Sequence, residues 1–151
     1  MIKKLLFCTC LTEYCDRIFN SALTLAIEND AELWIYHGLG RQNLSKEEVI
    51  EALKRAEVRL SKAYADQMKR MGFTNYRINV SEGDVAGEIL KLARNAGMDM
   101  IILGISARAP IGPAEKMTLP SLGSVATETI KWAPCPVLVV PSALIAGLSQ
   151  M

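Results

Sequence analysis

The chain has 151 residues, which is the length of one domain, and 50% of them are hydrophobic. A chain of this size buries about 68–70% of the surface that its unfolded form exposes, so it can fold without disulfides or a metal. Lys and Arg number 17 against 16 Asp and Glu, and a net charge of +1 argues against nucleic-acid binding, because no strong field gathers a polyanion. The single histidine, His37, excludes mechanisms and metal sites that take several histidines from one chain.

The cellular location is predicted from the N-terminal segment and from the apolar runs. After two lysines the first apolar run stops at Thr9, which is too short for the core of a signal peptide. No apolar stretch approaches the roughly 20 residues that a membrane span needs. We therefore expect a cytoplasmic protein without a membrane partner, whose four cysteines are reduced thiols.

The first predicted elements are a strand, a helix and a second strand. Residues 4–10 form an apolar run typical of a strand that is buried on both faces. Thr12 is a candidate N-cap for a helix whose inward positions recur at helical spacing: Cys15, Ile18, Phe19, Ala22, Leu25 and Ala26. Residues 33–36 then form a short second strand.

A long amphipathic helix follows a polar loop. Ser45 and Glu48 have the spacing of a capping box, which predicts the start of the helix. Gly72 predicts its end, as a C-cap. Between them an apolar stripe repeats every three or four residues and predicts the buried face: Val49, Leu53, Ala56, Leu60, Ala63, Tyr64, Met68 and Met71.

The second half of the chain continues the alternation. Residues 76–80 and 100–103 are predicted strands, and a helix opened by Gly83 and Asp84 and closed by Gly97 connects them. A loop of residues 104–122 contains three prolines and leads into a helix over residues 123–132. Residues 137–140 form the fifth strand, and residues 142–151 form a C-terminal tail without a clear pattern.

Strands that alternate with helices predict an α/β fold of one domain over residues 1–151, Rossmann-like, with helices on both faces of a parallel sheet. The predicted five-stranded sheet has the order 3-2-1-4-5. In such sheets a ligand binds beyond the carboxyl ends of the strands, where the strand order switches. The segments after strands one, two and four are therefore the predicted site.

The loop after the fourth strand has features of an anion site. It begins at Gly104, passes Gly112 and ends in Gly123 and Ser124 at the start of a helix. Glycines let backbone N–H groups approach a ligand closely, and a helix N-terminus adds a partial positive charge. The alternative is that Ser124 is only an N-cap and the loop only a connection, although loops longer than about 12–15 residues are usually functional or disordered.

Four segments together resemble the universal stress protein family. They are Gly-Asp-Val at 83–85, Asp-Met-Ile-Ile-Leu-Gly at 99–104, Gly-Ser-Val-Ala at 123–126 and Ala-Pro-Cys-Pro-Val-Leu-Val-Val at 133–140. The resemblance covers nearly the whole chain and implies a regulatory stress-response module rather than an enzyme, with no catalytic residue. In the branch of the family that binds a nucleotide the ligand is ATP or AMP, and the candidate residues for binding such a nucleotide here are Thr9, Cys10, His37, Gly104, Gly112, Gly123, Ser124 and Val125. Its phosphates would lie on the amides of Gly112, Gly123, Ser124 and Val125, and its adenine near Thr9 and His37.

The sequence departs from the pattern of the nucleotide-binding members of that family. Their motif G-x2-G-x9-G-[ST] is matched with Ala109 in place of the first glycine and with ten residues, not nine, between Gly112 and Gly123. Cys10 stands where those members carry an aspartate, and Leu11 where a glycine is usual. Each departure weakens a phosphate site, so both a binding and a non-binding branch of the family stay open.

Three functional alternatives remain at this point. One is a nucleotide-hydrolysing α/β enzyme or a flavin-binding protein, although no nucleophile and base can be paired in the sequence. Another is a metal or redox site of Cys10, Cys15 and His37, which all fall on the ligand edge of the sheet, against plain packing of these side chains. A third is a pure interaction protein that uses its edge strand and tail.

The predicted quaternary structure is a homodimer. The fifth strand, with the sequence Val137, Leu138, Val139 and Val140, would lie at the sheet edge with no charged residue to guard it. An uncovered apolar edge is an aggregation hazard, and the same strand of a second copy is its simplest cover. The resembled family dimerises in this way, which favours the same arrangement here.

Overall fold

The computed structural model of the chain describes residues 2–106 and 122–141. In this part strands and helices alternate, as the sequence predicts. The elements are β1 (Lys4–Cys8), α1 (Glu13–Asn29), β2 (Glu32–Gly38), α2 (Lys46–Arg70), β3 (Tyr76–Ser81), α3 (Val85–Ala96), β4 (Met100–Gly104), α4 (Ser124–Trp132) and β5 (Val137–Val140).

The strands form one sheet in the order β3-β2-β1-β4-β5, and every neighbouring pair is parallel. The predicted order and direction are confirmed. The central strand β1 is apolar because both of its faces are covered: Leu5, Leu6 and Phe7 are fully buried. Strands β2 and β3 lie on one side of β1, and strands β4 and β5 lie on its other side. The strand order therefore switches direction between β1 and β4.

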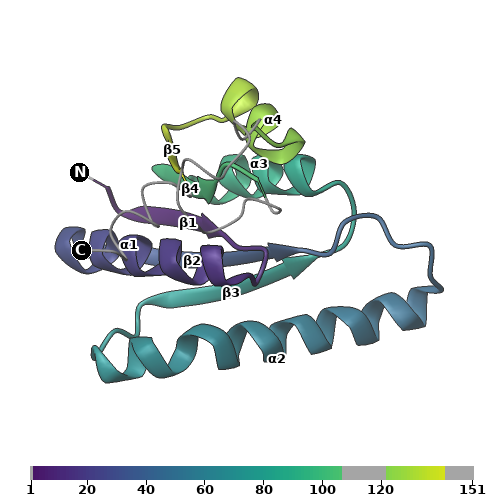
Figure 1. Cartoon of the computed structure of the whole chain (residues 1–151), viewed down its shortest axis with the longest axis horizontal. Coiled ribbons are helices and arrows are strands. Elements are labelled where there is room, and N and C mark those ends of the chain that lie inside the picture. Colours follow the sequence, from purple (N-terminus) through teal and green to yellow (C-terminus); the bar gives the residue numbers. More distant parts are fainter. Residues whose placement is uncertain (1, 107–121, 142–151) are drawn as a thin grey trace, which may run out of the picture.

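The helices divide between the two faces of the sheet (Figure 1). Helices α1 and α2 cover the face that carries Leu5, Phe7 and Ile35. Helices α3 and α4 cover the opposite face, which carries Leu6 and Leu103. The alternation of side chains along each strand thus feeds two separate apolar cores.

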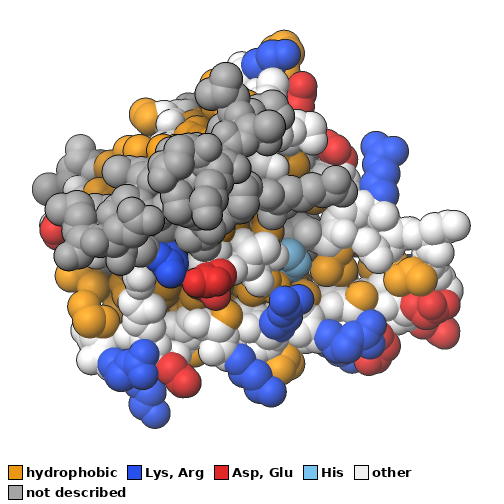
Figure 2. All heavy atoms as spheres, in the orientation of Figure 1, with side chains coloured by type: hydrophobic (Ala, Val, Ile, Leu, Met, Phe, Trp, Pro, Cys, Tyr) orange, Lys and Arg blue, Asp and Glu red, His pale blue; other side chains and the backbone are white. Residues whose placement is uncertain are grey.

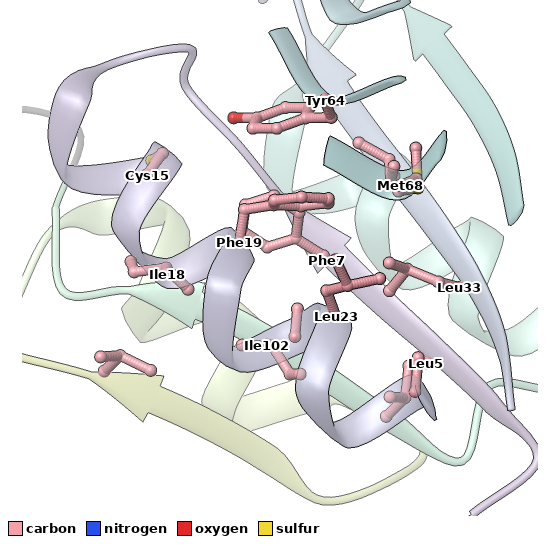
Figure 3. Packing of buried hydrophobic residues seen from close by; sticks show 14 of the residues in the cluster. Leu5, Phe7, Cys15, Ile18, Phe19, Leu23, Leu33, Tyr64, Met68 and Ile102 are labelled. Carbon is pink, nitrogen blue, oxygen red and sulfur yellow. The ribbon is translucent and has the colours of Figure 1, made fainter. Parts of the chain in front are cut away.

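The aromatic centre of the first core is compact, and Figure 3 shows its rings close together. Phe19 of α1 stacks on Tyr64 of α2, with ring centroids 4.4 Å apart. Phe7 of β1 lies 5.8 Å from each of the other two centroids, edge-on to Tyr64. These contacts hold the first two helices against the central strand.

The helix starts follow the predicted capping residues. Thr12 accepts from the N–H of Cys15, Ser45 from the N–H of Glu48, and Asp84 from the N–H of Gly87. The end of α3 at Gly97 is left-handed, with φ 69°, as expected of a glycine C-cap.

Basic and acidic side chains are interspersed along the exposed side of α2 in the view of Figure 2.

One predicted strand end and one predicted buried helix face were wrong in detail. Strand β1 ends at Cys8 rather than at residue 10, because the chain turns at Leu11, whose φ is 61°. On α2 the predicted stripe is too wide: Ala63 is exposed, and Met71 is 60% exposed. The buried residues repeat strictly every four positions, because α2 covers the sheet along a narrow seam of Ala56, Leu60, Tyr64 and Met68.

Other predictions concern residues outside the described ranges. Gly112, Ala109 and most of the long loop lie there, as does the tail at 142–151. No helix among the described residues is long and apolar enough to span a bilayer.

Candidate functional site

A pocket of about 480 Å³ opens at the carboxyl ends of β1, β2 and β4, the place predicted from the topology. This volume lies within the range of small-molecule sites. Five segments line it: Cys8, Thr9 and Cys10 after β1 with Cys15 of α1; Tyr36, His37 and Gly38 of β2; Val85 and Ile89 of α3; Leu103, Gly104, Ile105 and Ser106 around the end of β4; and Gly123, Ser124, Val125 and Ala126 at the start of α4.

Seven of the eight predicted site residues therefore share one cavity: Thr9, Cys10, His37, Gly104, Gly123, Ser124 and Val125. The eighth, Gly112, lies outside the described residues. Sequence reasoning missed Tyr36, Val85 and Ile89 as lining residues. Apolar side chains at the first turns of a helix look the same in a sequence whether they fill a core or face a cavity.

His37 and Thr9 form the polar corner of the pocket. Nδ1 of His37 lies 2.7 Å from the carbonyl oxygen of Thr9. A carbonyl can only accept, so Nδ1 carries the proton and donates it, which leaves Nε2 as the ring nitrogen available to a ligand. Thr9 is 4% exposed, and its hydroxyl lies 2.7 Å from that of Tyr64.

Gly104 serves packing as well as lining the pocket. A Cβ at this position would lie 2.6 Å from the ring and hydroxyl of Tyr14. That hydroxyl accepts from the N–H of Ile105 at 2.9 Å and donates to the carbonyl of Val140. The absence of a side chain at Gly104 thus makes room for Tyr14, whose hydroxyl connects the C-terminal ends of β4 and β5 by hydrogen bonds.

The start of α4 places backbone donors at the pocket. Gly123 is the N-cap, and within the described residues no side chain caps this helix, in contrast to α1, α2 and α3. The first N–H groups of a helix have no partner inside the helix and carry a partial positive charge. Those of Ser124, Val125 and Ala126 begin at the wall of the cavity. The arrangement suits an anionic group.

Gly123 allows a close approach of two backbone segments. Its N–H donates to the carbonyl of Ile105 at 2.8 Å. An added Cβ would lie 3.2 Å from that same oxygen and 3.3 Å from Ser106. Its φ of −67° suits any residue, so a larger side chain here would be opposed by this tight contact and not by the backbone conformation.

Cys10 and Cys15 form a thiol pair at the edge of the pocket. The N–H of Cys10 donates to Sγ of Cys15 at 3.3 Å, and the thiol of Cys10 is hydrogen-bonded to the same sulfur. This bond from Cys10 is the main reason that the pKa of Cys15 is lowered, aided by the Cys10 amide and by the hydroxyl of Thr12. Giving that hydrogen bond is the main cause that raises the pKa of Cys10. Among the described residues no three His, Cys, Asp or Glu side chains converge as metal ligands would.

Comparisons with known proteins agree on one family. The family model for the universal stress protein family matches residues 1–141. A protein of Staphylococcus haemolyticus named as a universal stress protein is 33% identical over 128 residues, which cover 81% of this chain and 74% of that protein.

Solved structures show the same fold. The universal stress protein UspA from Lactobacillus plantarum aligns with a TM-score of 0.69 at 19% identity, over 92% of this chain and 97% of its own. A universal stress protein family protein from Arabidopsis thaliana, solved with AMP bound, aligns with a TM-score of 0.61 at 18% identity, over 92% and 91% of the two chains. The parallel sheet, the site at its switch point and these matches agree: the chain belongs to the universal stress protein family.

Proposed function

We propose that this protein is a stress-response binding module that holds an adenine nucleotide in the pocket between β1, β2 and β4. The observation that carries the proposal is the start of α4, where backbone donors without a side-chain cap line the same cavity as the imidazole of His37. The AMP-bound Arabidopsis relative of the same fold supports the choice of ligand class.

The phosphate end of the ligand would lie against α4. The N–H groups of Ser124, Val125 and Ala126 point along the helix axis toward the pocket and supply fixed partial positive charge. The hydroxyl of Ser124 adds one further donor. The described lining contains no lysine or arginine, so backbone donors supply the attraction in this part of the site.

The adenine end would lie at the polar corner. Nε2 of His37 can accept from the exocyclic amine of adenine while Nδ1 stays bonded to Thr9. Val85 and Ile89 of α3 provide an apolar wall for the base. Cys10, in place of the aspartate of the nucleotide-binding members, offers no carboxylate to the ligand, and we expect weaker binding for that reason.

Proline at Ser124 is a sharp test of the phosphate contact. Position 124 is the first residue of α4, where proline is tolerated, and Gly123 with ψ 163° already has the extended conformation that precedes proline. Ser124→Pro removes one N–H and the hydroxyl, whereas Ser124→Ala removes the hydroxyl alone. We expect proline to weaken ATP and AMP binding about tenfold to a hundredfold, and alanine no more than about tenfold.

Isothermal titration calorimetry on both variants and the unmodified protein measures this difference, with circular dichroism as the control for folding. Equal affinity of Ser124→Pro and the unmodified protein would remove α4 from the site. No binding at millimolar ATP would place the protein in the non-binding branch. Valine at Gly123 is a poorer probe, because its Cβ would press on the backbone at Ile105 and Ser106.

We also propose that the protein binds its nucleotide without turning it over. The described lining of the pocket contains no Asp or Glu that could activate water, and in the proposed arrangement Nε2 of His37 faces the adenine, away from the phosphates at α4. Incubation with ATP should therefore release no ADP above the buffer rate. The flavin alternative predicts a visible absorbance band in the purified protein, which we do not expect.

We propose a homodimer through β5, working in the cytoplasm. β5 pairs with β4 on one side and is the last strand of the described sheet, and no other strand of the described residues pairs with its outer edge. Leu138 is 38% exposed along that edge, and Trp132, at the end of α4 near it, is 67% exposed. A two-fold pairing of β5 with its copy would satisfy the free backbone groups and cover apolar surface.

A further inference from the structure

We propose that Cys10 and Cys15 are a reversible redox site: a low-molecular-weight hydroperoxide oxidises them to an intramolecular disulfide at the edge of the pocket. The two residues are separated by four others, and both line the cavity. Oxidation of the pair requires no bound nucleotide.

The backbone between β1 and α1 already brings the two side chains together. Leu11 adopts a left-handed conformation, with φ 61°, and turns the chain back so that the N–H of Cys10 lies 3.3 Å from Sγ of Cys15. Cβ of Cys10 is only two bonds from that nitrogen. A rotation of the Cys10 side chain is therefore the main movement needed to bond the two sulfur atoms.

Hydrogen bonds on both sides hold this turn in place. Oγ1 of Thr9 accepts from the N–H of Leu11 at 3.0 Å, and Oγ1 of Thr12 accepts from the N–H of Cys15 at 3.3 Å. A left-handed conformation is unfavourable for a leucine, and these contacts maintain it. The pair is thus preorganised before any oxidant arrives.

The two thiols differ in a way that fits a nucleophile and a resolving partner. Cys15 is the third residue of α1, where the helix N-terminus favours a thiolate, and its pKa is lowered. Cys10 is exposed and stays protonated as the donor. Burial raises the pKa of Cys8 and of Cys135, so these two thiols are poorer nucleophiles.

The chemistry balances with hydrogen peroxide as the oxidant. The Cys15 thiolate attacks one peroxide oxygen, the O–O bond breaks, and hydroxide leaves, so that Cys15 becomes a sulfenic acid. The hydroxide takes the proton of Cys10 to form water. The Cys10 thiolate then attacks the sulfenic sulfur, the S–S bond forms, and hydroxide leaves and is protonated by solvent. Two thiols and one peroxide give one disulfide and two waters, and a dithiol reverses the change.

The test uses the full chain with Cys8 and Cys135 both replaced by alanine, so that only the proposed pair remains. This step is needed because trypsin leaves Cys8, Cys10 and Cys15 in one peptide, cut after Lys4 and after Arg17. After limited peroxide, intact mass spectrometry should show the loss of two hydrogen atoms. Maleimide labelling should fall to zero thiols and return to two after treatment with dithiothreitol.

Two further variants separate the roles, with circular dichroism as the folding control. In Cys10→Ser, Cys15 should stop at the sulfenic acid and gain one dimedone label. In Cys15→Ala, limited peroxide should leave Cys10 free. The proposal is overturned if the double-alanine variant keeps both thiols, if its disulfide joins two chains, or if Cys15→Ala reacts as fast as the parent.

Discussion

A chain of hydrogen bonds beneath the pocket gives Tyr64 a structural role that its ring alone does not explain. The hydroxyl of Tyr64 donates to Oδ1 of Asp16 at 2.9 Å, so its oxygen is left to accept the proton of Thr9 at 2.7 Å. Thr9 in turn accepts from the N–H of Leu11. Burial is the main cause that raises the pKa of Tyr64, which keeps the hydroxyl a donor. The three links tie α1, α2 and the end of β1 together.

At the residue scale we expect Tyr64→Phe to lower the free energy of unfolding by about 1–3 kcal/mol, because the hydroxyl of Thr9 is buried and would lose its acceptor. Tyr76→Phe is the matched control. The Tyr76 hydroxyl makes no hydrogen bond within the described ranges, and its loss should change stability by less than about 0.5 kcal/mol. Urea denaturation measures both. Equal effects of the two substitutions would contradict the hydrogen-bond chain.

Helix α1 is well capped at its N-terminus and ends in an unfavourable backbone conformation at its C-terminus. Thr12 caps its N-terminus, and Glu13 and Asp16 in the first turn suit the helix dipole. At the other end Asp30 is the C-cap with φ 52°, a left-handed conformation that favours glycine, and the last turn contains no basic residue. The negative charge of Asp30 is also unfavourable at this end of a helix.

At the element scale we expect Asp30→Gly to raise the free energy of unfolding by about 0.5–1 kcal/mol, because it removes both the steric cost and the charge. Asp30 is exposed, so no packing is lost. Asp30→Asn removes the charge and keeps a side chain tolerant of this conformation, and should gain less. Thermal unfolding ranks the three proteins, and a glycine variant less stable than the original would refute the interpretation.

On the scale of the whole molecule, the proposed dimer depends on the edge strand β5. Val139 packs against the first core, so a lysine there would also disturb the fold. Leu138 is more exposed and is the better position for a charge. In a two-fold pairing of β5 the lysines of two copies would come close, and like charges across paired strands are destabilising.

We expect Leu138→Lys to convert the dimer into a folded monomer, measured by light scattering. Val58→Lys is the control, since Val58 is 54% exposed on α2 and lies away from β5; it should leave the dimer intact. An unmodified protein that is monomeric would end the proposal. So would a Leu138→Lys variant that remains a stable dimer.

The sequence by itself was sufficient for the element order, the parallel sheet and most helix ends. These depend on local signals: the apolar run in β1, the caps at Thr12, Ser45 and Asp84, and the glycine at residue 97. Ligands of parallel sheets bind beyond the carboxyl ends of the strands, and this generalisation located the edge of the sheet where seven of the eight predicted site residues line one cavity.

Only the tertiary structure decided how these residues are used. It showed that Gly104 makes room for Tyr14 and that Leu11 turns the chain back. It also showed that α2 buries a seam four residues apart rather than a broad stripe. Each result depends on distances between segments far apart in the chain, or on a backbone conformation that side-chain type alone does not reveal. Periodicity reports which side of an element is apolar, whereas a cavity, a close contact or a thiol pair depends on what the neighbouring elements place opposite it.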